Sequence, residues 1–394
     1  MMEGWKRKPL MEVATVSTGK WDANHAVEDG EYRFYTCAYE YLYSDTKRFS
    51  GKCLILPGNG ANVGEVFYYD GEFDAYQRTY VLSDIKIDPE FLHYHMLLYW
   101  RSLGTKKQFG SATNYIKIGN FKDYKVEYPP LPEQQRIVSI LDHCFAAIDK
   151  AKANAEQNLQ NAKELFESYL QGVFERNDWE AKKWGELCDF VRGPFGGSLK
   201  KSIFIEEGYA VYEQKHAIHD HFNQLRYFID EDKFNEMKRF ELLPGDIIMS
   251  CSGVTLGRVA VVPEGIPRGV INQALLKLTP KDIVSVHFIK HWLRSKLFQD
   301  IIFEHAAGAA IPNVPAAKIL KEIKIPCPSL NIQNKITIKI DKVLTETQKL
   351  QAHYQKKIDD LEELKKSILQ KAFAGELKTE KMVEEMEEVE EVEL

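Results

Sequence analysis

Residues 131–174 read LPEQQRIVSILDHCFAAIDKAKANAEQNLQNAKELFESYLQGVF. The same pattern returns 199 positions later, without a gap, in residues 330–373 as LNIQNKITIKIDKVLTETQKLQAHYQKKIDDLEELKKSILQKAF. Matching residues hold the register from Gln134 and Gln333 near the start to Phe174 and Phe373 at the end. A register kept over this length indicates two copies of one element, and each copy follows a longer, more variable segment.

Both copies predict one long helix. Their apolar side chains recur at alternating steps of four and three, which is the heptad pattern of a coiled coil. At 1.5 Å per residue each helix would span roughly 60 Å. An ordinary core helix is the alternative, but such helices usually end after three or four turns. The predicted seam, with polar positions Asn158 and Lys357, is Ile137, Leu141, Cys144, Ile148, Ala151, Ala155, Asn158, Ala162, Leu165 and Tyr169, then Ile336, Ile340, Val343, Thr347, Leu350, Tyr354, Lys357, Leu361, Leu364 and Ile368.

The net charge of −6 is unevenly distributed along the chain. Residues 131–178 carry −3 and residues 330–375 carry +3, so the two helices are predicted to pack on each other. Residues 376–394 form an acidic tail of charge −7 that is predicted to be disordered. The remaining chain is close to neutral, which argues against strong nonspecific binding to the DNA backbone.

The variable segments, residues 1–130 and 179–329, also correspond to each other. Trp5 and Trp179 open them, and Gly19 and Gly193 follow fourteen residues later in each. Each segment then shows an apolar strand, a glycine-bearing turn, further strands, a helix (89–103 and 283–302) and a Gly-rich loop (110–114 and 308–313). This order predicts two α+β domains, each with a small twisted sheet.

The bulk composition favours a cytoplasmic protein of several domains. No signal peptide and no bilayer-spanning stretch is visible, so membrane attachment is not expected. The six cysteines are scattered and form no CxxC pair, which suits buried thiols in a reducing compartment and not a zinc site.

Several phrases of the chain resemble one family. Residues 128–137, YPPLPEQQRI, are similar to the phrase that opens the central helix in specificity (S) subunits of type I restriction–modification systems. Residues 73–82 (FDAYQRTYVL), 193–200 (GPFGGSLK) and 369–377 (LQKAFAGEL) are also similar to that family. The second copy departs from the opening phrase, with PSLNIQN at residues 328–334. The resemblance covers nearly the whole chain except the acidic tail.

The resemblance implies a fold of two target recognition domains separated by two long antiparallel coiled-coil helices with pseudo-two-fold symmetry. Residues 1–130 and 179–329 would be these domains, and residues 131–178 and 330–375 the central and C-terminal spacer helices. Each domain would read half of a bipartite, asymmetric site in double-stranded DNA. Two methyltransferase (M) subunits carrying S-adenosylmethionine would dock on the chain, with restriction (R) subunits beyond them. The S subunit itself would hold no cofactor and perform no catalysis.

Candidate DNA contacts follow from residue types and positions. Basic clusters are predicted to contact phosphates, with a solvated surface as the alternative for each: Lys47, Arg48, Lys106, Lys107, Lys200, Lys201, Lys238 and Arg239. Polar side chains in the glycine-bearing loops are predicted to contact bases, with a turn or cap role as the alternative: Asn59, Asn62, Ser111, Thr113, Asn114 and Tyr115, then Ser250, Ser252, Thr255, Arg258 and Asn313.

Catalytic and metal-binding motifs are not found. Gly58, Gly60 and Gly64 lack the dinucleotide-loop spacing, there is no P-loop, and no nucleophile with a base can be assembled. His216, His219 and His221 with Asp220 are more typical of a loop than of a metal site. Two other functions stay open at this point: a diverged methyltransferase or nuclease, and a coiled-coil scaffold whose two domains bind proteins.

Overall fold

The computed structural model describes residues 4–106, 114–175, 179–195, 197–306 and 312–377. The chain divides into two compact units, Met1–Ala155 with Lys356–Leu394, and Glu156–Gln355. Most of the predicted acidic tail lies outside the described residues, as do Lys107, Ser111 and Thr113 among the predicted contacts.

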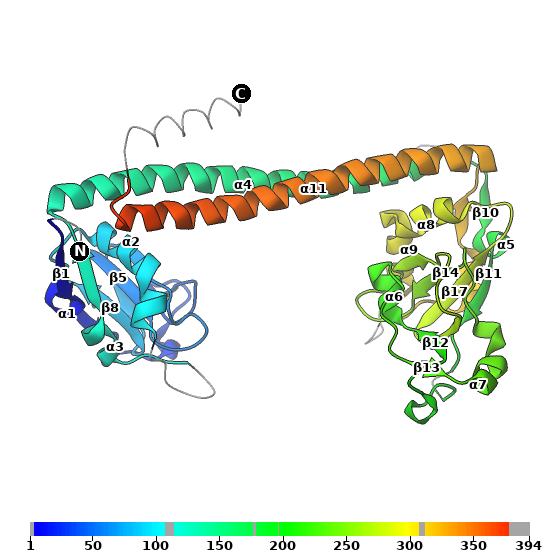
Figure 1. The fold of residues 1–394 in the computed structure, drawn as a ribbon, viewed down its shortest axis with the longest axis horizontal. Helices are drawn as coiled ribbons and strands as arrows, with labels where there is room; N and C mark the ends of the chain where they lie inside the picture. The colour runs from blue at the N-terminus through cyan, green and yellow to red at the C-terminus, as the bar shows by residue number, and fades with distance from the viewer. Residues whose placement is uncertain (1–3, 107–113, 176–178, 196, 307–311, 378–394) are drawn as a thin grey trace. The chain divides into compact units, whose positions relative to one another are not determined.

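The globular part of the first unit is built from short strands and helices (Figure 1). In chain order these are β1 (Lys6–Pro9), α1 (Leu10–Val13), β2 (Thr15–Thr18), η1 (Ala23–His25), β3 (Tyr32–Tyr35), β4 (Leu42–Ser44), β5 (Lys52–Pro57), β6 (Phe67–Asp70), β7 (Phe73–Ala75), β8 (Thr79–Ser83), α2 (Pro89–Tyr99), η2 (Trp100–Gly104), α3 (Ile118–Asp123) and β9 (Lys125–Tyr128).

The second unit has corresponding elements in the same order, with three added helices among the described residues, α6, α7 and the short helix η4. They are β10 (Ala181–Lys183), α5 (Trp184–Leu187), β11 (Cys188–Arg192), η3 (Lys201–Ile203), β12 (Tyr209–Tyr212), α6 (Gln214–His219), β13 (Phe228–Ile229), α7 (Glu231–Glu236), η4 (Lys238–Phe240), β14 (Ile247–Ser250), β15 (Val259–Val261), β16 (Gly269–Ile271), β17 (Leu275–Pro280), α8 (Val286–Arg294), α9 (Lys296–Ala306), α10 (Ala317–Glu322) and β18 (Lys324–Pro326).

Sheet topology is the same in both units. The four-stranded sheets have the orders β2-β8-β5-β6 and β11-β17-β14-β15, and the three-stranded sheets the orders β4-β3-β7 and β13-β12-β16. The β3–β7 and β12–β16 pairs are both parallel. In each unit the first strand pairs with the strand that precedes the long helix, β1 with β9 and β10 with β18. This confirms the predicted repeat of two α+β domains.

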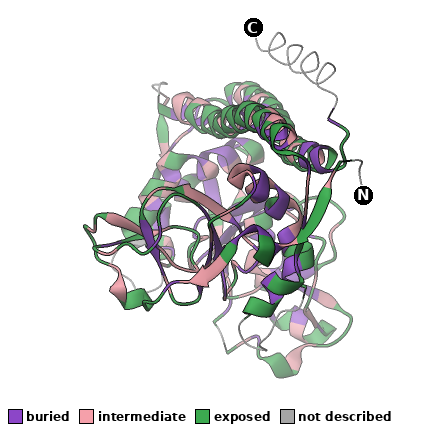
Figure 2. Cartoon of the chain, turned by 90° about the vertical axis from the view of Figure 1, so that its left-hand side faces the viewer, coloured by how far each residue is buried: buried purple, intermediate pink, exposed green. Residues whose placement is uncertain are grey.

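Each core lies between a sheet and the helices that follow it (Figure 2). In the first unit Phe91 of α2 is fully buried, and its ring lies 5.2 Å from that of Phe373 at the end of α11. In the second unit Phe288 of α8 is fully buried, 5.5 Å from Phe174 of α4. Burial of these aromatic rings attaches the ends of the long helices to the domains.

One predicted helix is interrupted. The segment 283–302 forms two helices, α8 and α9, because Ser295 adopts extended backbone angles (φ −66°, ψ 151°). The Ser295 hydroxyl donates to the carbonyl of Trp292 at 2.6 Å. In the first unit α2 runs directly into the π-helical turn η2.

The two long helices are α4 (Leu131–Glu175) and α11 (Leu330–Phe373). In the first unit Asp149 pairs with Lys365 at 2.6 Å and Lys152 pairs with Glu362 at 2.7 Å. Residue numbers rise along one helix as they fall along the other, so the helices are antiparallel, as predicted. In the described part of the chain, no helix combines the length and apolar character that crossing a bilayer needs.

The inward face of each long helix shifts part-way along. Asn158 is exposed and Leu165 is 55% exposed, so the predicted seam is wrong there. In α11, Ile358 is 7% exposed, while its predicted seam neighbour Leu364 is 47% exposed. A straight α-helix drifts by about 20° per heptad against a strict seven-residue repeat, so the inward position moves one residue on. The residues that take over from Asn158, Leu165, Leu350, Lys357 and Leu364 are Leu159, Phe166, Gln351, Ile358 and Lys365.

Candidate nucleic-acid interface

In the first unit two loops meet beyond the end of β5. The turn after β5 and the residues before α3 form a short antiparallel bridge between Asn59 and Tyr115. The amide of Gly60 donates to the carbonyl of Asn114 at 2.8 Å, and that of Ile116 donates to Gly58 at 2.9 Å. The predicted base contacts Asn59, Asn114 and Tyr115 are therefore brought together.

The second unit repeats this bridge with different side chains. Ser252, in the turn after β14, bridges to Asn313 before α10. The amide of Gly253 donates to Pro312 at 2.9 Å, and that of Val314 donates to Cys251 at 2.9 Å. The two loop pairs have matching backbone hydrogen bonds, although the bridged residues are 56 positions apart in the first unit and 61 in the second.

Glycine is required at the bend of each turn. Gly60 has a φ of +88° and Gly253 a φ of +79°, in the left-handed region that side-chain-bearing residues rarely adopt. These glycines let each turn reverse sharply, so that the neighbouring side chains stand at the loop surface.

In each domain a residue that follows the third strand holds the glycine-bearing turn in place through hydrogen bonds. This residue is Cys37 after β3 in the first unit and Gln214 after β12 in the second. Asn62 donates from Nδ2 to the carbonyl of Cys37 at 2.8 Å. In the second unit Gln214 donates from Nε2 to Ser250 Oγ and to the Ser252 carbonyl, both at 2.6 Å. Ser250 is fully buried, so the structure places it beneath the turn and not at a DNA-contacting surface. Its predicted base contact is replaced by a positioning role, and Thr255 lies near the same amide at 3.4 Å.

Other side chains at this edge were not predicted from the sequence. Arg192, the last residue of β11, donates from Nη2 to Asn313 Oδ1 at 3.0 Å and is exposed. Arg258, which is one of the predicted base contacts, is also exposed and stands directly after the turn. Arg192, Gln214 and Cys37 carry no motif, and they reach the loops only through strand pairing. The sequence holds one signal for Arg192, because this residue stands directly before Gly193, which matches Gly19 in the repeat.

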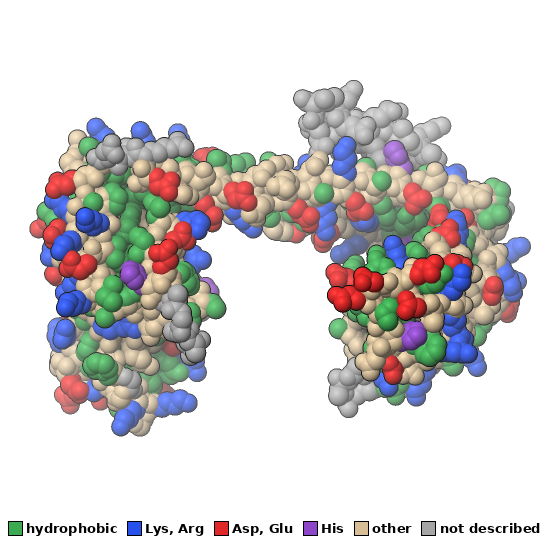
Figure 3. All heavy atoms as spheres, turned by 180° about the vertical axis from the view of Figure 1, so that it is seen from behind, with side chains coloured by type: hydrophobic (Ala, Val, Ile, Leu, Met, Phe, Trp, Pro, Cys, Tyr) green, Lys and Arg blue, Asp and Glu red, His purple; other side chains and the backbone are tan. Residues whose placement is uncertain are grey.

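The predicted phosphate contacts lie on exposed surface but are partly neutralised. Lys47 pairs with Glu72 at 2.6 Å, and Lys238 pairs with Glu241 at 2.6 Å. Arg48, Lys106, Lys200, Lys201 and Arg239 are exposed. On the face seen in Figure 3, acidic and basic side chains alternate and form no continuous basic surface. Such a surface favours selective contacts over strong nonspecific attraction.

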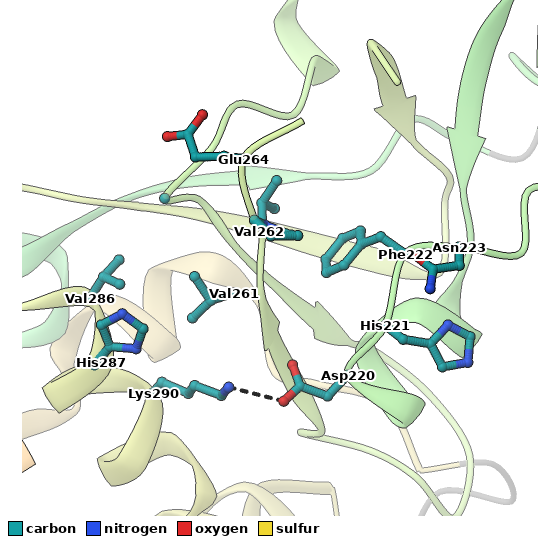
Figure 4. Close-up of a pocket in the computed structure, with 12 residues that line it drawn as sticks. Asp220, His221, Phe222, Asn223, Val261, Val262, Glu264, Val286, His287 and Lys290 are labelled. Carbon is teal, nitrogen blue, oxygen red and sulfur yellow. Dashed lines mark hydrogen bonds and ion pairs between the residues drawn. The ribbon is translucent and has the colours of Figure 1, made fainter. Parts of the chain in front are cut away.

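A pocket of about 600 Å³ in the second unit has different chemistry (Figure 4). Asp220 pairs with Lys290 at 2.9 Å and with Arg294 at 2.7 Å, so one carboxylate engages both cations. His216 lies nearby but is fully buried, and burial lowers its pKa. The described residues contain no group of three His, Cys, Asp or Glu side chains placed to hold a metal ion.

The thiols of the described core are not activated nucleophiles. Burial raises the pKa of both Cys188 and Cys251 to about 12, so neither forms a thiolate at neutral pH. The paired loops of each domain, in contrast, present hydrogen-bonding side chains on a backbone that is itself held by hydrogen bonds. Such side chains are suited to the recognition of base edges.

The family model for the type I restriction modification DNA specificity domain matches residues 2–159 and again residues 176–371. The chain belongs to this family. It is 27% identical over 412 residues to the EcoDI specificity subunit of Escherichia coli, covering 95% of this chain and 88% of that protein. It is 24% identical to the MjaVIII specificity subunit of Methanocaldococcus jannaschii, over 82% of this chain and 79% of that protein.

Solved structures support the fold of this specificity family member. A chain from work on complex assembly and conformational transition of the type I R-M system matches with a TM-score of 0.76 at 19% identity, covering 95% of this chain and 99% of that one. The HsdS subunit from Thermoanaerobacter tengcongensis matches with a TM-score of 0.56 at 18% identity, over 95% and 98%.

Proposed function

We propose that this chain is the non-catalytic specificity subunit of a type I restriction–modification complex and reads a bipartite, asymmetric site in double-stranded DNA. The observation that carries the proposal is the pair of matching loop bridges, Asn59 with Tyr115 and Ser252 with Asn313. One backbone arrangement holding different side chains in two domains suits the reading of two different half-sites.

The side chains at the two edges favour different base contacts. Asparagine can bond adenine through two hydrogen bonds, and arginine can bond guanine in the same way in the major groove. The first edge presents Asn59 and Tyr115, while the second presents Arg192, Asn313 and Arg258. The near-neutral surface supports sequence-selective binding over binding to any duplex.

The proposed partners follow from the family. Two methyltransferase subunits would dock on the chain and supply S-adenosylmethionine, restriction subunits would complete the complex, and the assembly would act in the cytoplasm. No feature of the described residues favours a cofactor bound by this chain itself. A self-contained methyltransferase would need one, so titration of S-adenosylmethionine into the purified chain separates the two functions, with no binding expected.

Half-site selectivity tests the proposal directly. We would purify the complex of this chain with its methyltransferase subunits, and map methylated sites in DNA for Tyr115→Ala and for Arg192→Ala. Each lost contact removes ~1–3 kcal/mol of discrimination, so we expect relaxed bases in one half-site only, a different half for each variant. Met11→Ala, on the exposed part of α1, is the control. A complex that binds all duplexes equally would refute the function.

A further inference from the structure

Each domain exposes an aromatic ring two residues after the glycine that follows its first main-sheet strand. In the first unit Trp21 follows Gly19 and is 43% exposed. In the second unit Phe195 follows Gly193 and is 94% exposed. The two rings therefore occupy matching positions of the repeat, 174 residues apart.

The two glycines fix these positions. A Cβ on Gly19 would lie 1.6 Å from the carbonyl oxygen of Ala75, and a Cβ on Gly193 would lie 1.9 Å from that of Asn272. The chain therefore crosses directly over the end of the parallel strand in both domains. Any larger residue would push the following aromatic residue away from the sheet edge.

Trp21 is held rigidly by a buried carboxylate. Its indole Nε1 donates to Asp74 Oδ2 at 3.1 Å, and Asp74 is 1% exposed. Thr46 donates to the same oxygen at 2.7 Å and lies 2.8 Å from the ring nitrogen Nε2 of His25. The His25 ring stacks on the indole with centroids 4.1 Å apart and planes 8° apart. An exposed ring supported in this way loses little entropy on binding.

The part of the Trp21 side chain that a ligand could contact is apolar. Asp74 occupies its only hydrogen-bond donor, and His25 covers one ring face. Its free surface can therefore contact a partner only by stacking or van der Waals packing. A polar hollow of about 400 Å³ surrounds it, lined by Lys20, Asn24 and Gln77 among others. An aromatic ring beside a lysine and amides suits a nucleotide better than an apolar peptide.

A series of contacts connects the segment that carries Trp21 to the paired loops of the first domain. The amide of Gln77 donates to the Trp21 carbonyl at 2.7 Å. One residue on, the Arg78 carbonyl lies 3.5 Å from the sulfur of Cys37, whose own carbonyl accepts from Asn62. In the second unit Arg192, which precedes Gly193, contacts Asn313 directly. Both aromatic residues therefore stand on the same edge as the loop bridge of their own domain.

We propose that Trp21 and Phe195 are specificity-determining contacts, each packing against the sugar and base edge of the half-site read by its own domain. The inference rests on the proposed DNA-recognition function and adds an apolar contact to the hydrogen-bonding loops. Trp21, preorganised by Asp74 and His25, serves the first half-site, and Phe195 serves the second.

Binding measurements with the assembled methyltransferase complex test this. We would compare Trp21→Ala and Phe195→Ala on three duplexes: the intact site, a site with the first half scrambled, and a site with the second half scrambled. An aromatic ring packed against one nucleotide contributes ~1–3 kcal/mol, so each variant should bind the intact site about 5- to 150-fold more weakly. On the duplex whose first half is scrambled, Trp21→Ala should bind as the unchanged chain does, because the contact it lacks is then absent from both. Phe195→Ala should show the same on the duplex whose second half is scrambled.

Controls separate contact from folding. Trp21→Phe keeps a ring and should retain most affinity, while Met11→Ala removes a similarly exposed side chain far from the edge and should bind normally. Phe195 is almost wholly in solvent, so its loss leaves the fold intact. Normal binding by both alanine variants, or equal losses on all three duplexes, overturns the inference. The proposed function would still stand if the loop variants changed single half-sites, and would fall only if no sequence preference remained.

Discussion

Two glutamines at matching positions of the repeat join each long helix to its domain. Gln134 accepts at Oε1 from the Asp88 amide at 2.8 Å and donates from Nε2 to Pro129 at 2.8 Å. Gln333 accepts from the Ser285 amide at 2.7 Å and donates to Pro328 at 2.7 Å. Asp88 and Ser285 are the N-caps of α2 and α8. This pairing explains why glutamine recurs here although the neighbouring residues differ.

Replacing either glutamine should destabilise the unit that contains it. Gln134 is 2% exposed and Gln333 is fully buried, so alanine leaves a buried amide and a buried carbonyl unpaired. Each orphaned group costs ~1–3 kcal/mol, so the two groups together give about 2–6 kcal/mol for Gln134→Ala or Gln333→Ala. Urea unfolding measures the loss. The exposed neighbour Gln135→Ala is the control, and an equal effect there would contradict the role of the buried amide.

A buried histidine should make the first unit sensitive to acid. Burial lowers the pKa of His95 to about 3, while Tyr124 Oη lies 3.1 Å from its Nδ1. The unfolded chain binds a proton below about pH 6.5 and the folded chain does not, so stability is complete above that pH and falls on acidification toward pH 3. His95→Gln should reduce the slope of unfolding free energy by about 1.4 kcal/mol per pH unit. Urea unfolding at several pH values between about 3 and 6.5 measures the slope, and a slope equal to that of the unchanged chain would contradict the role of His95.

At the scale of elements, the drift of the inward face predicts which apolar side chains stabilise the packing of the two long helices on each other. Ile358→Ala removes a side chain that is 7% exposed and should cost about 2–4 kcal/mol. Leu364→Ala, six residues along at a position of the predicted seam, is 47% exposed and should change stability by at most about 0.5 kcal/mol. Thermal unfolding of the two variants compares them, and a larger loss for Leu364→Ala would restore the strict heptad seam.

The same helices show what periodicity can and cannot predict. The pattern predicted two long helices because apolar spacing and the repeat are local properties of the chain, whereas their antiparallel orientation was implied by the family resemblance. It missed the shift from Asn158 to Leu159, because the degree of supercoiling depends on packing against the partner helix. Hydropathy alone also missed the break at Ser295, whose extended backbone is set by tertiary contacts.

At the scale of the whole chain, the repeat predicted that both domains share one topology, and the matching strand orders confirm this. The individual loops were also predicted, since glycines and amide side chains mark turns, but their pairing was found only in the structure. The side chains that support Trp21 and the loop turns were not predicted from the sequence. Asp74 meets Trp21 from 53 residues away and Gln214 meets Ser250 from 36 residues away, through contacts that only strand pairing creates. Side-chain networks of this kind carry no sequence motif.

The last prediction concerns the spacing between the half-sites. Because Asp149 faces Lys365 and Lys152 faces Glu362, positions after Ala151 and after Glu362 lie level on the two helices. Duplicating residues 145–151 and 356–362 adds one heptad to each helix, or about 10 Å. This length matches about three base-pair steps of 3.4 Å.

Those steps also turn the duplex by roughly a third of a turn, since B-DNA repeats about every 10–10.5 base pairs. We therefore expect the unspecified gap to widen by one to about three base pairs, with both half-site sequences unchanged, in methylation maps of the reconstituted complex. An insertion into α4 alone breaks the level pairing and should abolish methylation. A double insertion that rewrites either half-site, or leaves the gap at its original length, would show that the helices do not set the spacing.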